Sequence, residues 1–185
     1  EYEGPAEAAL EDYFESVKAD QERASLIIRS DPTIFAYCFL KDKQNKPLKL
    51  SPHQDKIVND KNRYILVVGA VQIGKTWAIG VKALHHALFV PNATVIIGSA
   101  SDNQATMILD EIKGMMNRSG ISYESLMDSV NNRTEIHLKN SDGKGLSIIK
   151  AFCATDKVMG FAGTLVLIDE LGTWENDSLY ESAFI

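Results

Sequence analysis

Residues 69–76 carry the sequence GAVQIGKT, in which a glycine is followed after four residues by Gly-Lys-Thr. This spacing suits the binding of a phosphate group. Gly69 and Gly74 allow the backbone to turn so that successive N–H groups, from about residue 72 to residue 77, point at one anion. A helix that begins near Lys75 adds the positive end of its dipole to the same place.

The two side chains that end this loop have separate tasks in such chemistry. Lys75 would reach the β- and γ-phosphates of a nucleoside triphosphate, and the Thr76 hydroxyl would bind Mg²⁺. A chance match is improbable, because the loop lies between an apolar run and an amphipathic helical pattern, as the mechanism requires. The expected nucleotide-contacting residues of the loop are Gly69, Gln72, Ile73, Gly74, Lys75, Thr76 and Trp77. The side chain of Trp77 also belongs to an apolar stripe, which favours a place in the core.

Two adjacent carboxylates, Asp169 and Glu170, follow the apolar run TLVLI at residues 164–168. Side chains alternate across a strand, so the two carboxylates diverge and suit different tasks. Asp169 is expected to hold Mg²⁺, and Glu170 to orient and polarise the attacking water. A solvated strand end is the plain alternative. Mechanical ATPases of the RecA-like type usually carry a carboxylate at the second position, whereas many P-loop kinases and GTPases do not.

Gln54 admits two interpretations. With Ser51 as N-cap and Pro52 at the first helical position, Gln54 completes a capping box. Alternatively, its amide could hydrogen-bond the donor–acceptor edge of adenine. The local pattern by itself favours the cap.

The elements that must position these residues alternate along the chain, which predicts an α/β fold with a mostly parallel sheet. Apolar runs predict buried strands, and helical periodicity predicts helices around them. The turn at SDGKG predicts a hairpin or a pair of sheet strands. An earlier helical region ends at the SDP motif, because the residue before a proline avoids the helical conformation. The expected strands lie at 64–68, 94–98 and 164–168, with hairpin strands in RTEIHLKN and LSIIKAFCA. The expected helices lie at 5–30, after Lys75, and from Ser101 or Asp102 to Gly120, and a basic connector spans 41–49.

Composition limits the classes of protein and partner that fit the chain. The 185 residues are 45% hydrophobic and carry a net charge of −6, so there is no general basic surface for nucleic acid, although a local patch remains possible. No apolar run approaches the roughly 20 residues of a membrane span. Cys38 and Cys153 are expected to be buried free thiols, and no histidine spacing suggests a metal site. We expect an intracellular protein without a membrane anchor.

Taken together, these residues resemble the ATPase domain of phage terminase large subunits, the motors that package DNA into procapsids. The likeness runs from about Pro47 to Glu175 and includes PLKLSPHQDKIV, GAVQIGKT, VIIGSASDNQATMILDEI and MGFAGTLVLIDE. It implies a RecA-like P-loop NTPase core at 47–185 that follows an N-terminal helical accessory region and linker at 1–46. In that family the glutamine that matches Gln54 contacts adenine.

The resemblance also implies cofactors, partners and location. ATP and Mg²⁺ would be the cofactors, and double-stranded DNA, a portal protein and a terminase small subunit the partners. A homo-oligomeric ring of the full-length protein, in the cytoplasm of an infected bacterium, would drive DNA translocation by ATP hydrolysis. The family's coupling motif and nuclease would lie beyond residue 185.

One departure concerns arginine. Terminases often carry an arginine inside the loop, where this chain has Val71, Gln72 and Ile73. Arg63, Arg118 and Arg133 are the candidates for a charge-stabilising arginine within the chain, and a neighbouring subunit is another source.

Two other functions fit parts of the pattern. A superfamily 2 helicase core also combines a glutamine, a phosphate loop and an acidic strand end, but Leu171-Gly172 follows Glu170 where a DEAD or DExH motif would continue. A nucleotide-binding switch without catalysis is the third reading, and the presence of Glu170 disfavours it.

Overall fold

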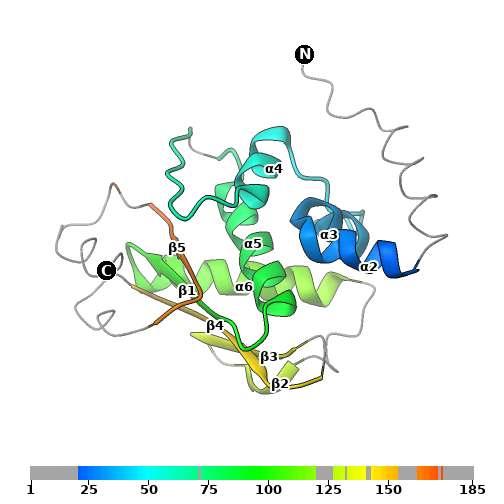
Figure 1. The fold of residues 1–185 in the computed structure, drawn as a ribbon. Coiled ribbons are helices and arrows are strands. Elements are labelled where there is room, and N and C mark those ends of the chain that lie inside the picture. Colours follow the sequence, from blue (N-terminus) through cyan, green and yellow to red (C-terminus); the bar gives the residue numbers. More distant parts are fainter. Residues whose placement is uncertain are drawn as a thin grey trace.

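The computed structural model describes residues 21–70, 72–119, 127–131, 133–140, 143–153, 162–170 and 172 (Figure 1). The elements alternate between helices and strands after an opening group of helices. The helices are α2 (Gln21–Ser30), α3 (Pro32–Phe39), α4 (Pro52–Asn59), α5 (Lys75–Phe89) and α6 (Asp102–Arg118). The strands are β1 (Thr94–Ser99), β2 (Met127–Asn131), β3 (Glu135–Lys139), β4 (Leu146–Cys153) and β5 (Leu165–Ile168).

The five strands form one sheet in the order β2-β3-β4-β1-β5. Strand β1 pairs in parallel with both β4 and β5. The remaining pairs, β2 with β3 and β3 with β4, are antiparallel, and the second of these is the expected hairpin. The predicted α/β fold with a mostly parallel sheet is confirmed, because β3 is the only one of the five described strands that runs opposite to the others.

Helices α5 and α6 cover one face of this sheet (Figure 1). The stripe predicted for α5 is confirmed, because Val81 and Leu84 are fully buried and Leu88 nearly so. They pack with residues from that face of the sheet in one continuous core, which includes Val95, Ile97, Ile136, Ile149 and Ala151. This core fixes the start of α5, and therefore the end of the phosphate loop, against the sheet.

The opening helices belong to the same core. The predicted break at SDP occurs where α2 ends, and the Asp31 carboxylate then caps α3 by accepting the N–H groups of Thr33 (2.8 Å) and Ile34 (3.1 Å). Phe35 from α3 is 2% exposed and packs in the main cluster. Residues 5–20 of the predicted first helix lie outside the described residues. Across the described ranges, no helix has both the length and the apolar character that crossing a membrane requires.

The prediction of a buried strand at residues 64–68 is wrong for this structure. These residues pair with no strand among the described ones, and their exposures range from 39% for Ile65 and Val67 to 90% for Val68. Apolar character favours a strand only where a neighbouring strand can satisfy the backbone N–H and C=O groups. Among the described strands none pairs with this segment, and the edge strand β5 pairs only with β1.

Burial also differs from expectation at two further places. Strand β5 occurs where predicted but is half-buried, because it lies at the edge of the described sheet. Cys38 is exposed and Cys153 half-buried, so both thiols are free as expected but neither is fully buried.

Helix α6 begins as predicted with Ser101 as N-cap, whose hydroxyl accepts the Gln104 N–H, and it ends at Arg118. Gly120, its expected terminator, lies outside the described residues.

Candidate nucleotide site

The glycine-rich loop ends directly at the N-terminus of the 15-residue helix α5. Gly74 is the N-cap and has φ 81°, a left-handed conformation that glycine adopts at little cost. Gln72 also has a positive φ, 64°, which is unusual for a residue with a side chain. The loop therefore turns sharply into the helix, and the unpaired N–H groups of the first turn of α5 lie at its end. Val71 is not among the described residues.

The Lys75 side chain lies across its own loop, because its Nζ donates to the carbonyl of Ala70 (2.9 Å) and to that of Gly69 (3.3 Å). Burial raises the pKa of Asp169, and the positive charge of Lys75 opposes a small part of this rise. Helix α5, which begins with Lys75, packs against β5, the strand that ends before Asp169.

Helix α4 supports the loop from the other side. His53 Nε2 donates to the Ile73 carbonyl (2.8 Å), and Gln54 Nε2 donates to the Gly74 carbonyl (2.9 Å). A Cβ on Gly74 would clash with Gln54 Nε2. The other end of α4 is also held, because the Lys82 ammonium of α5 donates to the carbonyls of Ile57, Val58 and Asp60 at 2.8–3.1 Å. These bonds satisfy carbonyls that a helix C-terminus leaves without partners.

The capping role of Gln54 is present in this structure. Gln54 Oε1 accepts both the backbone N–H and the hydroxyl of Ser51, each at 2.8 Å. An amide oxygen has two lone pairs, so both acceptor positions are engaged. Contact with both groups of an adenine edge would need the Ser51 hydroxyl to turn away. The adenine-reading role therefore stays a prediction, with one specific rearrangement attached to it.

The acidic pair lies at the carboxyl end of β5. The Asp169 N–H donates to the Gly98 carbonyl of β1 (2.9 Å), and Asp169 Oδ1 accepts the Glu170 N–H (3.1 Å). Burial raises the pKa of Asp169, and the charge of Glu170 raises it further. Glu170 has φ 54°, so the chain turns sharply at this residue. Two crowded carboxylates of this kind form an environment that favours a bound cation.

Gln104 is a neighbour of this pair to which the sequence analysis assigned no role. Its Nε2 donates to Glu170 Oε2 at 2.6 Å. Its Oε1 accepts the hydroxyls of Ser101 (3.2 Å) and Ser99 (3.4 Å), so the amide is held on its other side as well. The signal for this residue was its place in the first turn of a helix that follows a buried strand. Parallel strands end at the same edge of a sheet, so this turn lies beside the end of β5.

The donors present suit Mg²⁺ rather than a metal held by the protein alone. Among the described residues there is no group of three or more histidine, cysteine, aspartate or glutamate side chains that could hold a metal ion. Mg²⁺ is usually bound by one or two protein oxygens together with substrate phosphates and water. The Thr76 hydroxyl and the Asp169 carboxylate, whose pKa is raised by burial, fit this pattern.

Trp77 and two of the candidate arginines, Arg63 and Arg118, make contacts outside the acidic pair. The Trp77 ring packs partly against the core, with Lys43 Nζ and the Arg118 guanidinium 5.8 and 5.9 Å from its centroid. Arg118 is also bound to Glu111 (3.1 Å) and donates to the Lys41 carbonyl (3.3 Å). Arg63 lies over the Tyr64 ring, 5.3 Å from its centroid. Arg133 is exposed on the turn before β3. None of the three forms a described contact with Lys75, Asp169 or Glu170.

A glycine-rich loop at a helix N-terminus, beside the acidic end of a parallel strand, is the arrangement of a P-loop nucleoside triphosphatase core. A comparison with known protein families gives a more specific assignment within this class. Residues 61–183 match the family described as terminase large subunit, ATPase domain, and because the match covers more than half of the chain, the chain belongs to that family. Membership supports an ATPase of phage DNA packaging and implies that the domain binds a nucleotide.

Among solved structures, the chain is similar to the large terminase ATPase domain of Thermus phage P74-26. The two share 18% sequence identity and superpose with a TM-score of 0.47. The likeness covers 73% of this chain and 63% of that one, so this chain spans less than two thirds of the solved domain. No curated protein matches the sequence.

Proposed function

We propose that this chain is the ATP-binding and hydrolysing motor domain of a viral DNA-packaging terminase large subunit. In this proposal, hydrolysis drives double-stranded DNA into a procapsid. Family membership supports the general function. The observation that carries the catalytic part is the glycine-rich loop, which enters the N-terminus of α5 through Gly74 in a left-handed conformation and is followed at once by Lys75 and Thr76.

The loop and the acidic pair have separate roles in the proposed reaction. The N–H groups at the start of α5 and the Lys75 ammonium bind and orient the phosphates. Thr76 and Asp169 would hold Mg²⁺, which neutralises negative charge on the phosphate oxygens when it is bound. The loop residues Gly69, Gln72, Ile73, Gly74 and Trp77 contribute backbone to the cradle.

Glu170 orients the attacking water and accepts its proton in this proposal. Its carboxylate is held by Gln104, which we assign as a positioning residue, because the amide is fixed in turn by Ser99 and Ser101. The Gln104 amide can donate to the carboxylate but cannot take a proton from water. It therefore sets the direction of Glu170 and takes no proton itself.

The remaining parts of the proposal concern partners and assembly. Double-stranded DNA, a portal protein and a terminase small subunit would be the partners, in the cytoplasm of an infected bacterium. The full-length protein would act as a homo-oligomeric ring. A neighbouring subunit would supply the charge-stabilising arginine, since Arg118 and Arg63 are engaged elsewhere. Residues 1–46 would form an accessory region that packs on the ATPase core at 47–185, as Phe35 and Leu40 do.

Binding and turnover test the nucleotide site separately. We expect titration calorimetry to detect Mg-ATP binding by the wild-type chain and a large loss of affinity in Lys75→Ala. Lys61→Ala is the matched control, because Lys61 is an exposed lysine outside the loop. Equal affinity in the wild type and Lys75→Ala would remove the phosphate-loop assignment.

Glu170→Gln distinguishes an enzyme from a nucleotide switch. The variant keeps the size of the side chain and loses the carboxylate that accepts a proton. We expect unchanged Mg-ATP affinity and loss of phosphate release, measured with the oligomeric full-length protein so that an arginine from a neighbouring subunit is present. Turnover equal to that of the wild type would show that Glu170 is not the catalytic carboxylate.

A further inference from the structure

The segment between α3 and α4 concentrates positive charge on an acidic protein. Residues 40–49, here called the lysine hairpin, contain four lysines and one aspartate, a net charge of +3. The whole chain carries −6, which leaves −9 for all other residues. A local patch of this sign opposes the overall charge, and such patches mark contact surfaces for anions.

The lysine hairpin is a built turn rather than the connector that the sequence suggested. Lys41 and Pro47 form an antiparallel bridge, and the Leu48 N–H donates to the Leu40 carbonyl (2.9 Å). Both leucines are buried in the main core, Leu40 at 1% and Leu48 at 5% exposure. The two ends of the hairpin are therefore anchored in the core of the protein.

The one acid of the hairpin stabilises the turn. Asp42 Oδ1 accepts the backbone N–H groups of Gln44 (2.8 Å) and Lys46 (2.9 Å), and Asn45 adopts a left-handed φ of 64°. The hydrogen bonds keep this carboxylate directed at the backbone of the turn. With this carboxylate counted, the hairpin still carries a net charge of +3.

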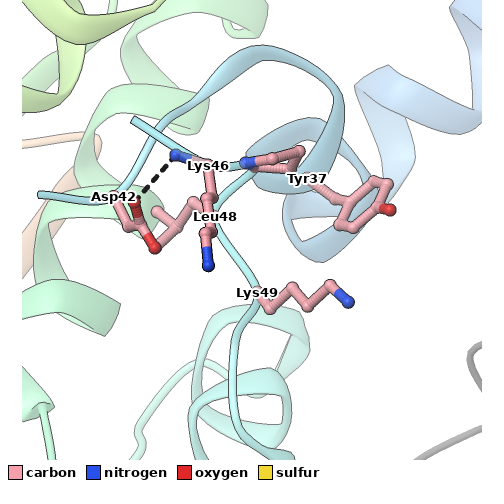
Figure 2. Close-up of a pocket in the computed structure, with 6 residues that line it drawn as sticks. Tyr37, Asp42, Lys46, Leu48 and Lys49 are labelled. Atoms are coloured by element: carbon pink, nitrogen blue, oxygen red, sulfur yellow. Dashed lines mark hydrogen bonds between the residues drawn. The ribbon is translucent and has the colours of Figure 1, made fainter. Parts of the chain in front are cut away.

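The lysines are displayed on different sides of this turn. Lys43 reaches Glu111 of α6 (3.3 Å) and the Trp77 ring, which ties the hairpin to the first turn of α5. Lys46 and Lys49 are exposed and line a shallow pocket of about 350 Å³ (Figure 2). Its lining consists of Tyr37, Asp42, Lys46, Pro47, Leu48 and Lys49. Two lysines thus lie at this surface beside a single carboxylate, which the turn already engages in hydrogen bonds.

We propose that the lysine hairpin contacts the phosphate backbone of double-stranded DNA. Duplex DNA carries one charge per about 1.7 Å of its axis, so a short rigid turn with several lysines can meet neighbouring phosphates at once. Such contacts depend on charge and position and need no base recognition. The proposal deepens the motor function, because it names a surface by which the domain would hold its substrate.

The test uses the 185-residue chain without nucleotide, so that it does not depend on the ATPase proposal. Binding of a labelled duplex of about 30 base pairs is measured by fluorescence anisotropy over a range of salt concentrations. The variant is Lys46→Glu with Lys49→Glu, which leaves Lys43 and its contacts with Glu111 and Trp77 in place. The control is Lys61→Glu with Lys139→Glu, which makes the same change in net charge at exposed lysines outside the hairpin.

We expect the hairpin variant to bind the duplex at least about tenfold more weakly than the wild type, and the control to change by less than about twofold. The slope of log Kd against log salt should fall by about 2 in the hairpin variant, because about two phosphate contacts are lost. Mg-ATP affinity should stay unchanged in both variants. A change in Mg-ATP affinity without a change in DNA affinity would overturn the assignment.

Three other outcomes also overturn it. Equal weakening in both variants would mean that net charge, rather than the hairpin, governs binding. No binding by the wild type at about 50 mM salt would remove the surface altogether. Binding of polyglutamate but not of the duplex would make an acidic protein the partner in place of DNA. None of these results bears on nucleotide binding, so the ATPase proposal stands or falls by its own experiment.

Discussion

Replacement of Gly74 by alanine tests how helix α4 supports the phosphate loop. Two costs add at this position. A left-handed φ of 81° costs a residue with a Cβ about 1–2 kcal/mol, and the Cβ would also displace the Gln54 amide from the Gly74 carbonyl. The lost hydrogen bond is worth about 0.5–1.5 kcal/mol. We expect the free energy of unfolding to fall by roughly 2–3 kcal/mol in total.

Gly143→Ala is the matched control for this prediction. Gly143 has a similar φ of 73°, but a Cβ there would meet nothing within 4 Å. It should therefore show the conformational cost alone, and any effect of alanine on the unfolded chain is common to both variants. Urea denaturation should place Gly74→Ala about 1 kcal/mol below Gly143→Ala.

A second background separates the clash from other causes. In Gln54→Ala the amide is absent, so the added Cβ at position 74 has space. Gly74→Ala should then cost the same as Gly143→Ala within about 0.5 kcal/mol. Our account of the α4–loop contact would be refuted if the two glycine variants were equally stable with Gln54 present. It would also be refuted if the extra cost persisted without Gln54.

Three further predictions concern the residues around this site. Lys82→Met removes the ammonium that caps α4, so urea denaturation should show a loss of about 1–3 kcal/mol, and a loss below about 0.5 kcal/mol would contradict the capping role. Gln104→Leu removes the hydrogen bond from Gln104 to the Glu170 carboxylate, so kcat should fall about tenfold or more while the Kd for Mg-ATP stays constant. A change in Kd alone would make Gln104 a binding residue. Asp169→Asn should weaken Mg²⁺-dependent ATP binding yet raise the melting temperature, because the raised pKa of Asp169 means that its ionised form destabilises the folded state. The gain in melting temperature of Asp169→Asn over the wild type should be absent below the ordinary aspartate pKa of about 4 and should grow as pH rises through the higher folded pKa. A gain that does not change with pH in thermal melts would contradict this prediction.

The sequence by itself determined where the helix after the glycine-rich loop begins and most of the elements around it. The spacing from Gly69 to Thr76 and the start of a helix at Lys75 follow from local rules, because each depends on residues within one or two turns. The strand at 94–98, the helix that begins after Ser101 and the hairpin of β3 and β4 follow from the same rules. Gln54 as a cap was equally local, since its partner Ser51 is three residues away.

Only the tertiary structure decided which of these parts meet. The bond from Gln104 to Glu170 spans 66 positions, and those from α4 to the loop carbonyls span 20. Contacts of this kind depend on the path of the chain between the two residues, which no local pattern encodes. The same reason explains the failure at residues 64–68, where the pattern is that of a strand. A strand is completed by hydrogen bonds to another segment, and that requirement lies outside the five residues themselves.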